Sequence, residues 1–452
     1  MDKQHENPLG VEPINHLMAR FAIPSIIAML VSALYNMVDQ FFIGHSVGMQ
    51  GNAATNVAFP LTITCTAVSL LFGIGGAANF NLSMGRKKPE EAKHFIGNAI
   101  FLMLSFGITL CLLVFLFLDP LLKLFGATAD ILTYSRTYTS ITAFGFPFVI
   151  LATGGSNLVR ADGSPNFSMA CTLIGCLINL VLDPLFIFVF HMGMAGAAWA
   201  TIIGQIISAS MVIWYLTRFK TVKLTLKELR PRAFACRRIL SLGMSPFLNQ
   251  LAIMIVQVVM NNVLVFYGGQ SVYGSEIPLA CAGIISKVNM IFFSISIGLS
   301  QGMQPIASFN YGAENYGRVR EAVIKTMTAS TLICTVAFIL FQLFPRQITG
   351  IFGSGSEEYF IFASRYFRIF LFFTFLNGIQ PVAGNFFTAI GKPVYGIFIS
   401  LTRQILFLLP LILILPRFFG IDGVLYSAPI ADFMAAVLAF FLTFRQLNKL
   451  GK

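Results

Sequence analysis

Long apolar runs separated by short polar or Gly/Pro-rich segments dominate the chain. Each run holds at least the roughly 20 residues that an α-helix needs to cross the hydrocarbon core of a bilayer. Because a helix satisfies its own backbone hydrogen bonds, it is the form in which such a run can enter lipid. The pattern predicts twelve transmembrane helices, at 16–43, 53–82, 96–118, 133–158, 168–190, 195–216, 241–267, 279–309, 323–344, 362–388, 394–415 and 423–444.

The second half of the chain repeats motifs of the first half at a nearly constant offset. GGAANFNLSMG at 75–85 is matched by GMQPIASFNYG at 302–312, and ADGSP at 161–165 by AIGKP at 389–393. Such repetition indicates two copies of one six-helix unit. Because six is an even number, both copies enter the membrane from the same side, and the axis that relates them runs along the membrane normal.

The longest polar stretch, TRFKTVKLTLKELRPRAFACRR at 217–238, lies near the middle of the chain. We therefore predict an N-terminal lobe over 1–216, a cytoplasmic basic linker over 217–240 and a C-terminal lobe over 241–452. The predicted fold is an all-α integral membrane protein, with 12 transmembrane helices in two six-helix lobes related by a pseudo-two-fold axis. Two such lobes around a central site are more typical of a transporter than of a channel or receptor.

Composition and charge agree with this interpretation. The chain is 56% hydrophobic and only 11% charged, which excludes a soluble globular fold. The net charge of +12 does not indicate nucleic-acid binding, because the basic residues are spread between apolar runs and form no continuous basic face. Segments on the side of both termini hold 20 Lys and Arg against three on the other side. This asymmetry predicts cytoplasmic termini.

Two carboxylates inside the predicted spans are candidates for chemistry, because an ionisable group is costly in hydrocarbon. Asp39 lies in the first span, and Asp183 lies deep in the fifth, one helical turn after Asn179. An amide and a carboxylate placed in this way can share a proton or a cation. The alternatives are that Asp183 caps a broken helix or bonds a neighbouring chain, and that Asp39 reaches the outer interface.

The second half offers mainly amides, which bind polar ligand groups without titrating. Lys287 also lies within a span, and Arg403 could pair with Asp432. We expect six polar side chains to contact substrate: Asn36, Asn157, Gln257, Asn261, Lys287 and Asn377.

Four motifs, YNMVDQFFIG, RADGSP, NLVLDPLFIF and GAAWATIIGQ, together resemble the multidrug and toxic compound extrusion family over essentially the whole chain. The resemblance is to the bacterial branch with the staphylococcal multidrug exporter and the DNA-damage-inducible type. It implies one ion-coupling network of Asp39, Asn179, Asp183 and Thr201, with Tyr138 as a further member. The family's vibrio-type branch carries carboxylates in the seventh and tenth helices, whereas this chain has Asn377 in the tenth. The resemblance therefore places coupling in the first lobe.

The predicted function is secondary active efflux of organic, mostly cationic compounds by antiport with H⁺ or Na⁺. We expect no enzymatic activity, no cofactor and no metal other than a possible Na⁺ in the coupling network. We expect a monomer in the inner membrane of a bacterium, with the lipid bilayer and small organic molecules as its partners and no nucleic acid.

Three rival functions remain. A flippase for lipid-linked saccharides would need several cations to hold a pyrophosphate, and only Lys287 and Arg403 qualify. A membrane-embedded enzyme would need clustered catalytic side chains, which the sequence does not suggest. The third rival is a receptor or channel; even-numbered repeats and two buried acids do not fit a pore lined by rings of like charge.

Overall fold

The computed structural model describes residues 7–274, 276–351 and 356–450, and every regular element in them is a helix. The first lobe comprises α2 (Ile14–Ser46), α3 (Met49–Gly85), α4 (Pro89–Leu116), α5 (Leu118–Leu124), α6 (Ala129–Phe144), α7 (Phe146–Ala161), α8 (Pro165–Pro184), the π-helix η1 (Leu185–Val189) and α9 (Gly193–Leu216), preceded by the short α1 (Pro8–Val11).

The second lobe repeats this order. It comprises α10 (Ala233–Gly269), α11 (Glu276–Gly312), α12 (Tyr316–Leu343), α13 (Pro345–Ile351), α14 (Glu357–Phe370), the 3₁₀ turn η2 (Thr374–Leu376), α15 (Ile379–Ala389), α16 (Pro393–Leu401), the π-helix η3 (Thr402–Leu408), α17 (Leu409–Phe419) and α18 (Ile421–Leu447).

In the described residues, ten helices are long and apolar enough to cross a membrane, and the number is twelve if each of two bent pairs is one span. The prediction of twelve spans in two lobes is thus confirmed, with two of the spans broken. The bent pairs are α6 with α7, at 54°, and α14 with η2 and α15, at 43°. The first bend falls at Gly145, directly before Phe146–Pro147, because a proline there cannot continue the hydrogen bonds of the preceding helix.

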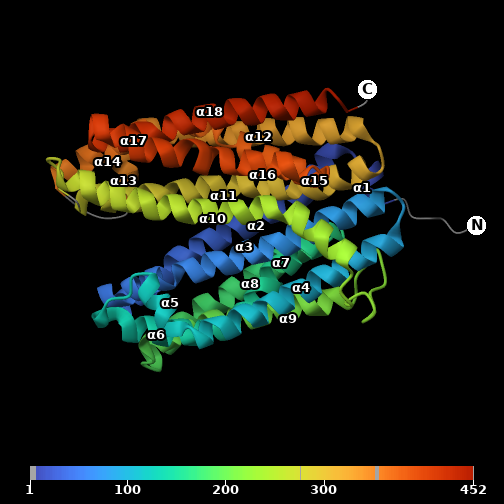
Figure 1. Ribbon diagram of the computed structural model, residues 1–452, viewed down its shortest axis with the longest axis horizontal. Coiled ribbons are helices and arrows are strands. Elements are labelled where there is room, and N and C mark those ends of the chain that lie inside the picture. The colour runs from blue at the N-terminus through green and yellow to red at the C-terminus, as the bar shows by residue number, and fades with distance from the viewer. Residues whose placement is uncertain (1–6, 275, 352–355, 451–452) are drawn as a thin grey trace, which may run out of the picture.

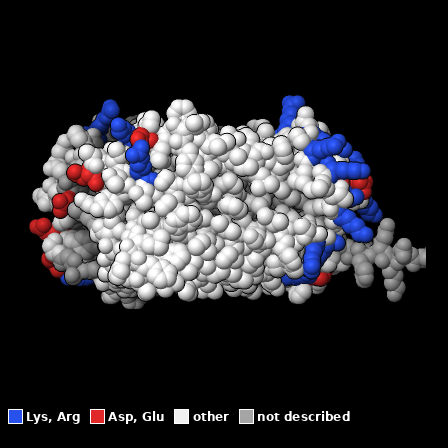
Figure 2. Space-filling model, turned by 90° about the horizontal axis from the view of Figure 1, so that it is seen from below, with Lys and Arg blue, Asp and Glu red and all other residues white. Residues whose placement is uncertain are grey.

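Charged side chains gather at the two ends of the molecule. On the face seen in Figure 2, a wide uncharged band separates these ends, and Lys and Arg predominate at the end near the N-terminus. Many large apolar side chains are exposed, such as Leu116 at 73% and Val181 at 67%. An apolar surface this extensive suits contact with lipid rather than with water.

The two lobes meet near the end of the molecule where both termini lie, called the terminal end below, and diverge toward the opposite end (Figure 1). Contact between them runs mainly along α2 with α11 and along α3 with α10. Glycine permits the close approach: a Cβ at Gly302 would lie 2.6 Å from the Cα of Ala22, and a Cβ at Gly298 would lie 2.6 Å from the Cα of Ile26. The terminal end is therefore closed by nearly direct backbone contact.

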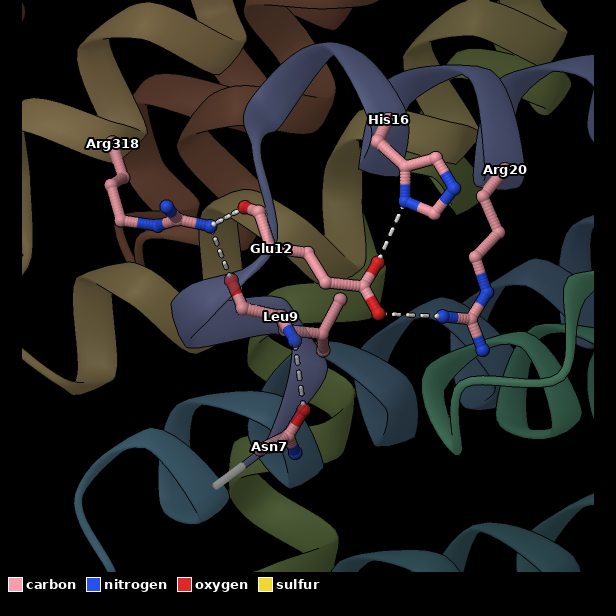
Figure 3. Close-up of polar contacts among 6 residues, drawn as sticks. All are labelled: Asn7, Leu9, Glu12, His16, Arg20 and Arg318. Atoms are coloured by element: carbon pink, nitrogen blue, oxygen red, sulfur yellow. Dashed lines mark hydrogen bonds and ion pairs between the residues drawn. The ribbon is translucent and has the colours of Figure 1, made fainter. Parts of the chain in front are cut away.

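The chain begins on the second lobe before it enters the first. Leu9, Leu17 and Phe21 pack in a hydrophobic cluster with second-lobe residues of α11, α12 and α15. Arg318, in the first turn of α12, donates hydrogen bonds to the carbonyl oxygens of Leu9, at 3.1 Å, and Glu12, at 2.5 Å. Figure 3 shows these bonds, together with the hydrogen bond that the Glu12 carboxylate accepts from Arg20 and its contact with His16, both in the first turns of α2. The start of α2 is thus held on the second lobe.

The basic segment between the lobes is attached to the first lobe. The Asp162 carboxylate accepts hydrogen bonds from the backbone N–H groups of Lys220, at 2.7 Å, and Thr221, at 3.0 Å. Asn98 donates to the Glu228 carbonyl, at 3.1 Å, and accepts from the Arg232 N–H, at 2.7 Å. The next helix, α10, begins at Ala233, eight residues before the predicted span at 241–267. The span extends because its first two turns pack on lobe 1.

Candidate functional site

Four helices of the first lobe bring the predicted coupling residues together. Asp39 comes from α2, Asn179 and Asp183 from successive turns of α8, and Thr201 from α9. Helices α2, α8 and α9 pack against one another. The carboxyl groups of Asp39 and Asp183 lie side by side. Residues distant in the sequence therefore form one polar cluster inside the lobe, as the resemblance implied, with Tyr138 of α6 beside both acids.

The cluster is buried. Asp39 is 7% exposed, Asn179 1% and Asp183 0%. Burial of Asp39 argues against the alternative that its side chain reaches the membrane surface. Among the hydrogen bonds between described residues, Asp183 receives one from the Asn179 amide, at 3.5 Å, and none that caps a helix. The Asn179 amide also donates to the Thr201 hydroxyl, at 3.2 Å.

The cluster contains more acceptors than donors. One oxygen each of Asp39, Asn179 and Asp183 is buried and has no hydrogen-bond partner among the described residues. None of the ion pairs in this part of the chain involves Asp39 or Asp183. Buried polar atoms are normally satisfied. Converging carboxylate and amide oxygens without a donor are suited to hold a proton or a hard cation such as Na⁺.

Tyr35 was not among the site residues predicted from the sequence, and its side chain lies beside Asp39, Thr201 and Tyr138. The signal was its position four residues before Asp39, because residues with this spacing share one face of a helix. Its phenolic hydroxyl adds a group that can either donate or accept a hydrogen bond at the edge of the cluster.

The second lobe also buries a carboxylate, but this one has a partner of opposite charge. Asp432 of α18 is 2% exposed and accepts a hydrogen bond from the Nε of Arg403, at 2.5 Å. Its other oxygen accepts from the Asn377 amide, at 3.0 Å. The predicted pairing of Arg403 with Asp432 is thus confirmed. Arg403 lies in the π-helix η3, and Asn377 lies in the break between η2 and α15, so both come from irregular parts of their spans.

The residues predicted to contact substrate do not form one cluster. Asn36 and Lys287 are exposed, on α2 and α11. Gln257 donates to Asn261, one turn further along α10, at 3.1 Å. Asn377 is bound to Asp432, as above, and Asn157 is buried on α7, where its oxygen accepts a hydrogen bond from Arg160. Their contact with substrate stays a prediction.

Twelve spans in two lobes, with an acidic cluster buried in one lobe, are the arrangement of a secondary membrane transporter. A family model described as MatE matches residues 24–185 and 251–414. The chain therefore belongs to the MatE family, the multidrug and toxic compound extrusion transporters, which are not enzymes.

Individual relatives agree with this assignment. The multidrug export protein MepA of Staphylococcus haemolyticus (strain JCSC1435) is 26% identical over 434 residues, covering 96% of this chain and 94% of the relative. Among solved structures, the fold is similar to that of an outward-facing MATE family multidrug resistance transporter of the MOP superfamily, with a TM-score of 0.90, 22% identity and coverage of 98% and 99%. A MOP superfamily transporter from Pyrococcus furiosus Vc1 (DSM3638), for which a reversed polarity of the binding pocket is described, gives a TM-score of 0.92, with 21% identity and full coverage of both chains.

Proposed function

We propose that this protein exports organic, mostly cationic compounds of several kinds, by antiport with H⁺ or Na⁺. The observation that carries the proposal is the pair of buried carboxyl groups, Asp39 and Asp183, with acceptor oxygens that no donor satisfies. The similarity of the chain to a multidrug export protein supports organic compounds as the substrate class. The network of Asp39, Asn179, Asp183 and Thr201, with Tyr138 and Tyr35 at its edge, is the proposed coupling site.

The chemistry of two adjacent carboxyl groups explains how one site can couple two fluxes. Neighbouring carboxylates in a low-dielectric interior cannot both be charged at low cost, so the pair takes up a proton or a cation readily. Uptake neutralises negative charge in the lobe and so weakens attraction for an organic cation. Loading of the coupling ion and binding of the substrate therefore disfavour each other, and such negative coupling between two ligands permits antiport.

We also infer the orientation and setting of the protein. The positive end visible in Figure 2 suits the cytoplasmic side, since cytoplasmic segments retain Lys and Arg. Both termini then face the cytoplasm, in the inner membrane of a bacterium, and the closed terminal end is the cytoplasmic end. A monomer suffices, because the coupling cluster is built within one chain.

The flippase reading has less support. It needed Lys287 and Arg403 as cations for a pyrophosphate, and the Arg403 guanidinium is held by the Asp432 carboxylate. A cation neutralised in this way attracts an anionic headgroup only weakly.

Dye transport into inverted membrane vesicles tests the proposal. A fluorescent organic cation is added outside, and either a pH gradient or, at fixed pH, a Na⁺ gradient is imposed. We expect one of the two gradients to drive accumulation, and Asp183→Asn to abolish it, because the amide keeps the shape of the side chain but removes its charge. The matched control is Asp130→Asn on α6, where the acid is exposed. Retained accumulation in Asp183→Asn at a normal protein level would exclude the coupling role.

A further inference from the structure

Arg160 is a buried cation that the proposed coupling site does not use. It lies in the last turn of α7, within the RADGSP motif, and is only 5% exposed. Its Nη1 donates to the Asn157 side-chain oxygen, at 3.2 Å, and to the Oε1 of Gln301, at 3.0 Å. Because α7 belongs to the first lobe and Gln301 lies on α11 of the second, the guanidinium spans the two lobes.

No carboxylate neutralises this charge. None of the ion pairs between described residues includes Arg160. Asp162, two residues later, is occupied by Tyr215, Lys220 and Thr221. A guanidinium cannot be deprotonated under ordinary conditions, so the site holds a full positive charge supported by two amide oxygens. Burying a charge without a counter-ion is costly, and its presence calls for a role.

The charge sits in the layer where the lobes touch. Gln301 is followed by Gly302, whose Cα region lies against the backbone of Ala22. All residues from Leu299 to Asn310 on α11 are buried, in contrast to the exposed Ser286 and Lys287 toward the other end of the same helix. Arg160 thus lies between the lobes at the closed terminal end, whereas Asp183 lies at the far end of α8, which begins at Pro165 just after α7 ends.

We propose that Arg160 is an electrostatic barrier, which keeps the coupling cation from passing between the lobes while the terminal end is closed. A fixed positive charge in a narrow, low-dielectric passage repels H⁺ and Na⁺ more strongly than a neutral seal would. Arg160 does not bind the ion itself; it supports coupling because the ion can then cross only when the terminal end opens. The inference rests on the proposed function, because a barrier of this kind matters only in an ion-coupled transporter.

The competing explanation is a mechanical lock, in which the hydrogen bond from Arg160 to Gln301 merely holds the lobes together. Two substitutions separate the explanations. Arg160→Lys keeps the charge but loses the planar guanidinium that reaches two acceptors at once. Gln301→Glu cancels the charge locally but strengthens the bond between the lobes.

The test measures ion leak without substrate, in liposomes that contain the purified protein. An imposed gradient drives H⁺ entry, followed with an enclosed pH dye, and in a parallel series radioactive Na⁺ entry. We expect Arg160→Gln to raise the leak of the coupling ion at least about tenfold, Gln301→Glu to raise it also, and Arg160→Lys to remain near the wild type. Leak of an uncharged solute of similar size should be unchanged in all three variants.

Two results would overturn the proposal. One is a wild-type leak in Arg160→Gln and Gln301→Glu, each shown to be folded by its elution volume and thermal unfolding. The other is a leak in Arg160→Lys with a tighter seal in Gln301→Glu, which would identify a lock. Failure of the proposed function is seen separately, as a wild-type protein in which added substrate moves no ion. Because two variants on different lobes test the same charge, misfolding of one leaves the other decisive.

Discussion

The two lobes share one architecture but treat their buried acids in opposite ways. In the first lobe, Asp39 and Asp183 lie together with no cation in reach among the described residues, and oxygens of both acids lack a donor. In the second lobe, Asp432 is fully engaged by Arg403 and Asn377. A repeated fold therefore carries one acid site whose oxygens lack an internal partner and one that is already satisfied from within. The difference supports the proposal that ion coupling belongs to the first lobe.

The largest effect is expected from giving the first lobe an internal cation, as the second lobe has. Asn179→Lys places an ammonium group one turn from Asp183. At about 4 Å and an effective dielectric of ~20, the attraction is about 4 kcal/mol, which weakens binding of an external cation by about 1,000-fold. We expect gradient-driven dye export to vanish.

Asn179→Met is the matched control, because it removes the amide without adding charge. It should lower the affinity for the coupling ion by only about tenfold, because the ion loses one polar ligand. Equal export by the Lys and Met variants, at equal protein levels, would show that charge in the cluster does not matter.

The next test removes the internal cation from the second lobe. Arg403→Leu leaves Asp432 buried and unpaired, and breaking a buried ion pair in this way typically costs about 3–5 kcal/mol. We expect a clear fall in the thermal unfolding temperature of the purified protein in detergent. The double variant Arg403→Leu with Asp432→Leu should recover most of that loss and keep the ion dependence of export.

Recovery in the double variant would show that the Arg403–Asp432 pair serves the stability of the protein and not ion coupling. A double variant that is as unstable as the single one would instead indicate that Arg403 stabilises the protein through contacts other than Asp432.

The smallest expected effect is at Asn377. Asn377→Ala removes one hydrogen bond to Asp432, worth about 0.5–1.5 kcal/mol, so we expect a change of a few fold in apparent substrate affinity and an unchanged response to the ion gradient. Asp39→Asn should do the reverse: it should flatten the response to the gradient while substrate still binds. Dye efflux at varied pH and Na⁺ gradients measures both. If Asn377→Ala loses gradient dependence and Asp39→Asn keeps it, coupling lies in the second lobe.

Much of the fold could be predicted because lipid imposes simple rules on sequence. Apolar runs of fixed length mark the spans, and the repeated motifs mark the two lobes. The bend at Gly145 was not predicted, since Pro147 falls within an apolar run that reads as one uninterrupted helix. The early start of α10 was missed because its first turns are polar on one side and gain their stability from packing on the first lobe.

The candidate site was predictable only where one helix carries two of its members. Asn179 and Asp183 share a face of α8 by their spacing, but their proximity to Asp39 depends on how α2 packs, and only the family resemblance suggested it. Arg160 lies two residues beyond the predicted end of the fourth span, at 158. In the structure α7 continues to Ala161 and buries it. A side chain that is buried by contact with the other lobe cannot be recognised from the pattern of apolar and polar residues in its own helix.

The start of each lobe's first helix lies on the other lobe. Leu17 and Phe21 of α2 complete a core of the second lobe, and Ala235 and Ile239 of α10 complete a core of the first. The halves of the chain are consequently interlaced, as in a domain-swapped dimer whose two subunits have been joined end to end. We therefore expect neither half to be stable until the other has been synthesised and inserted beside it.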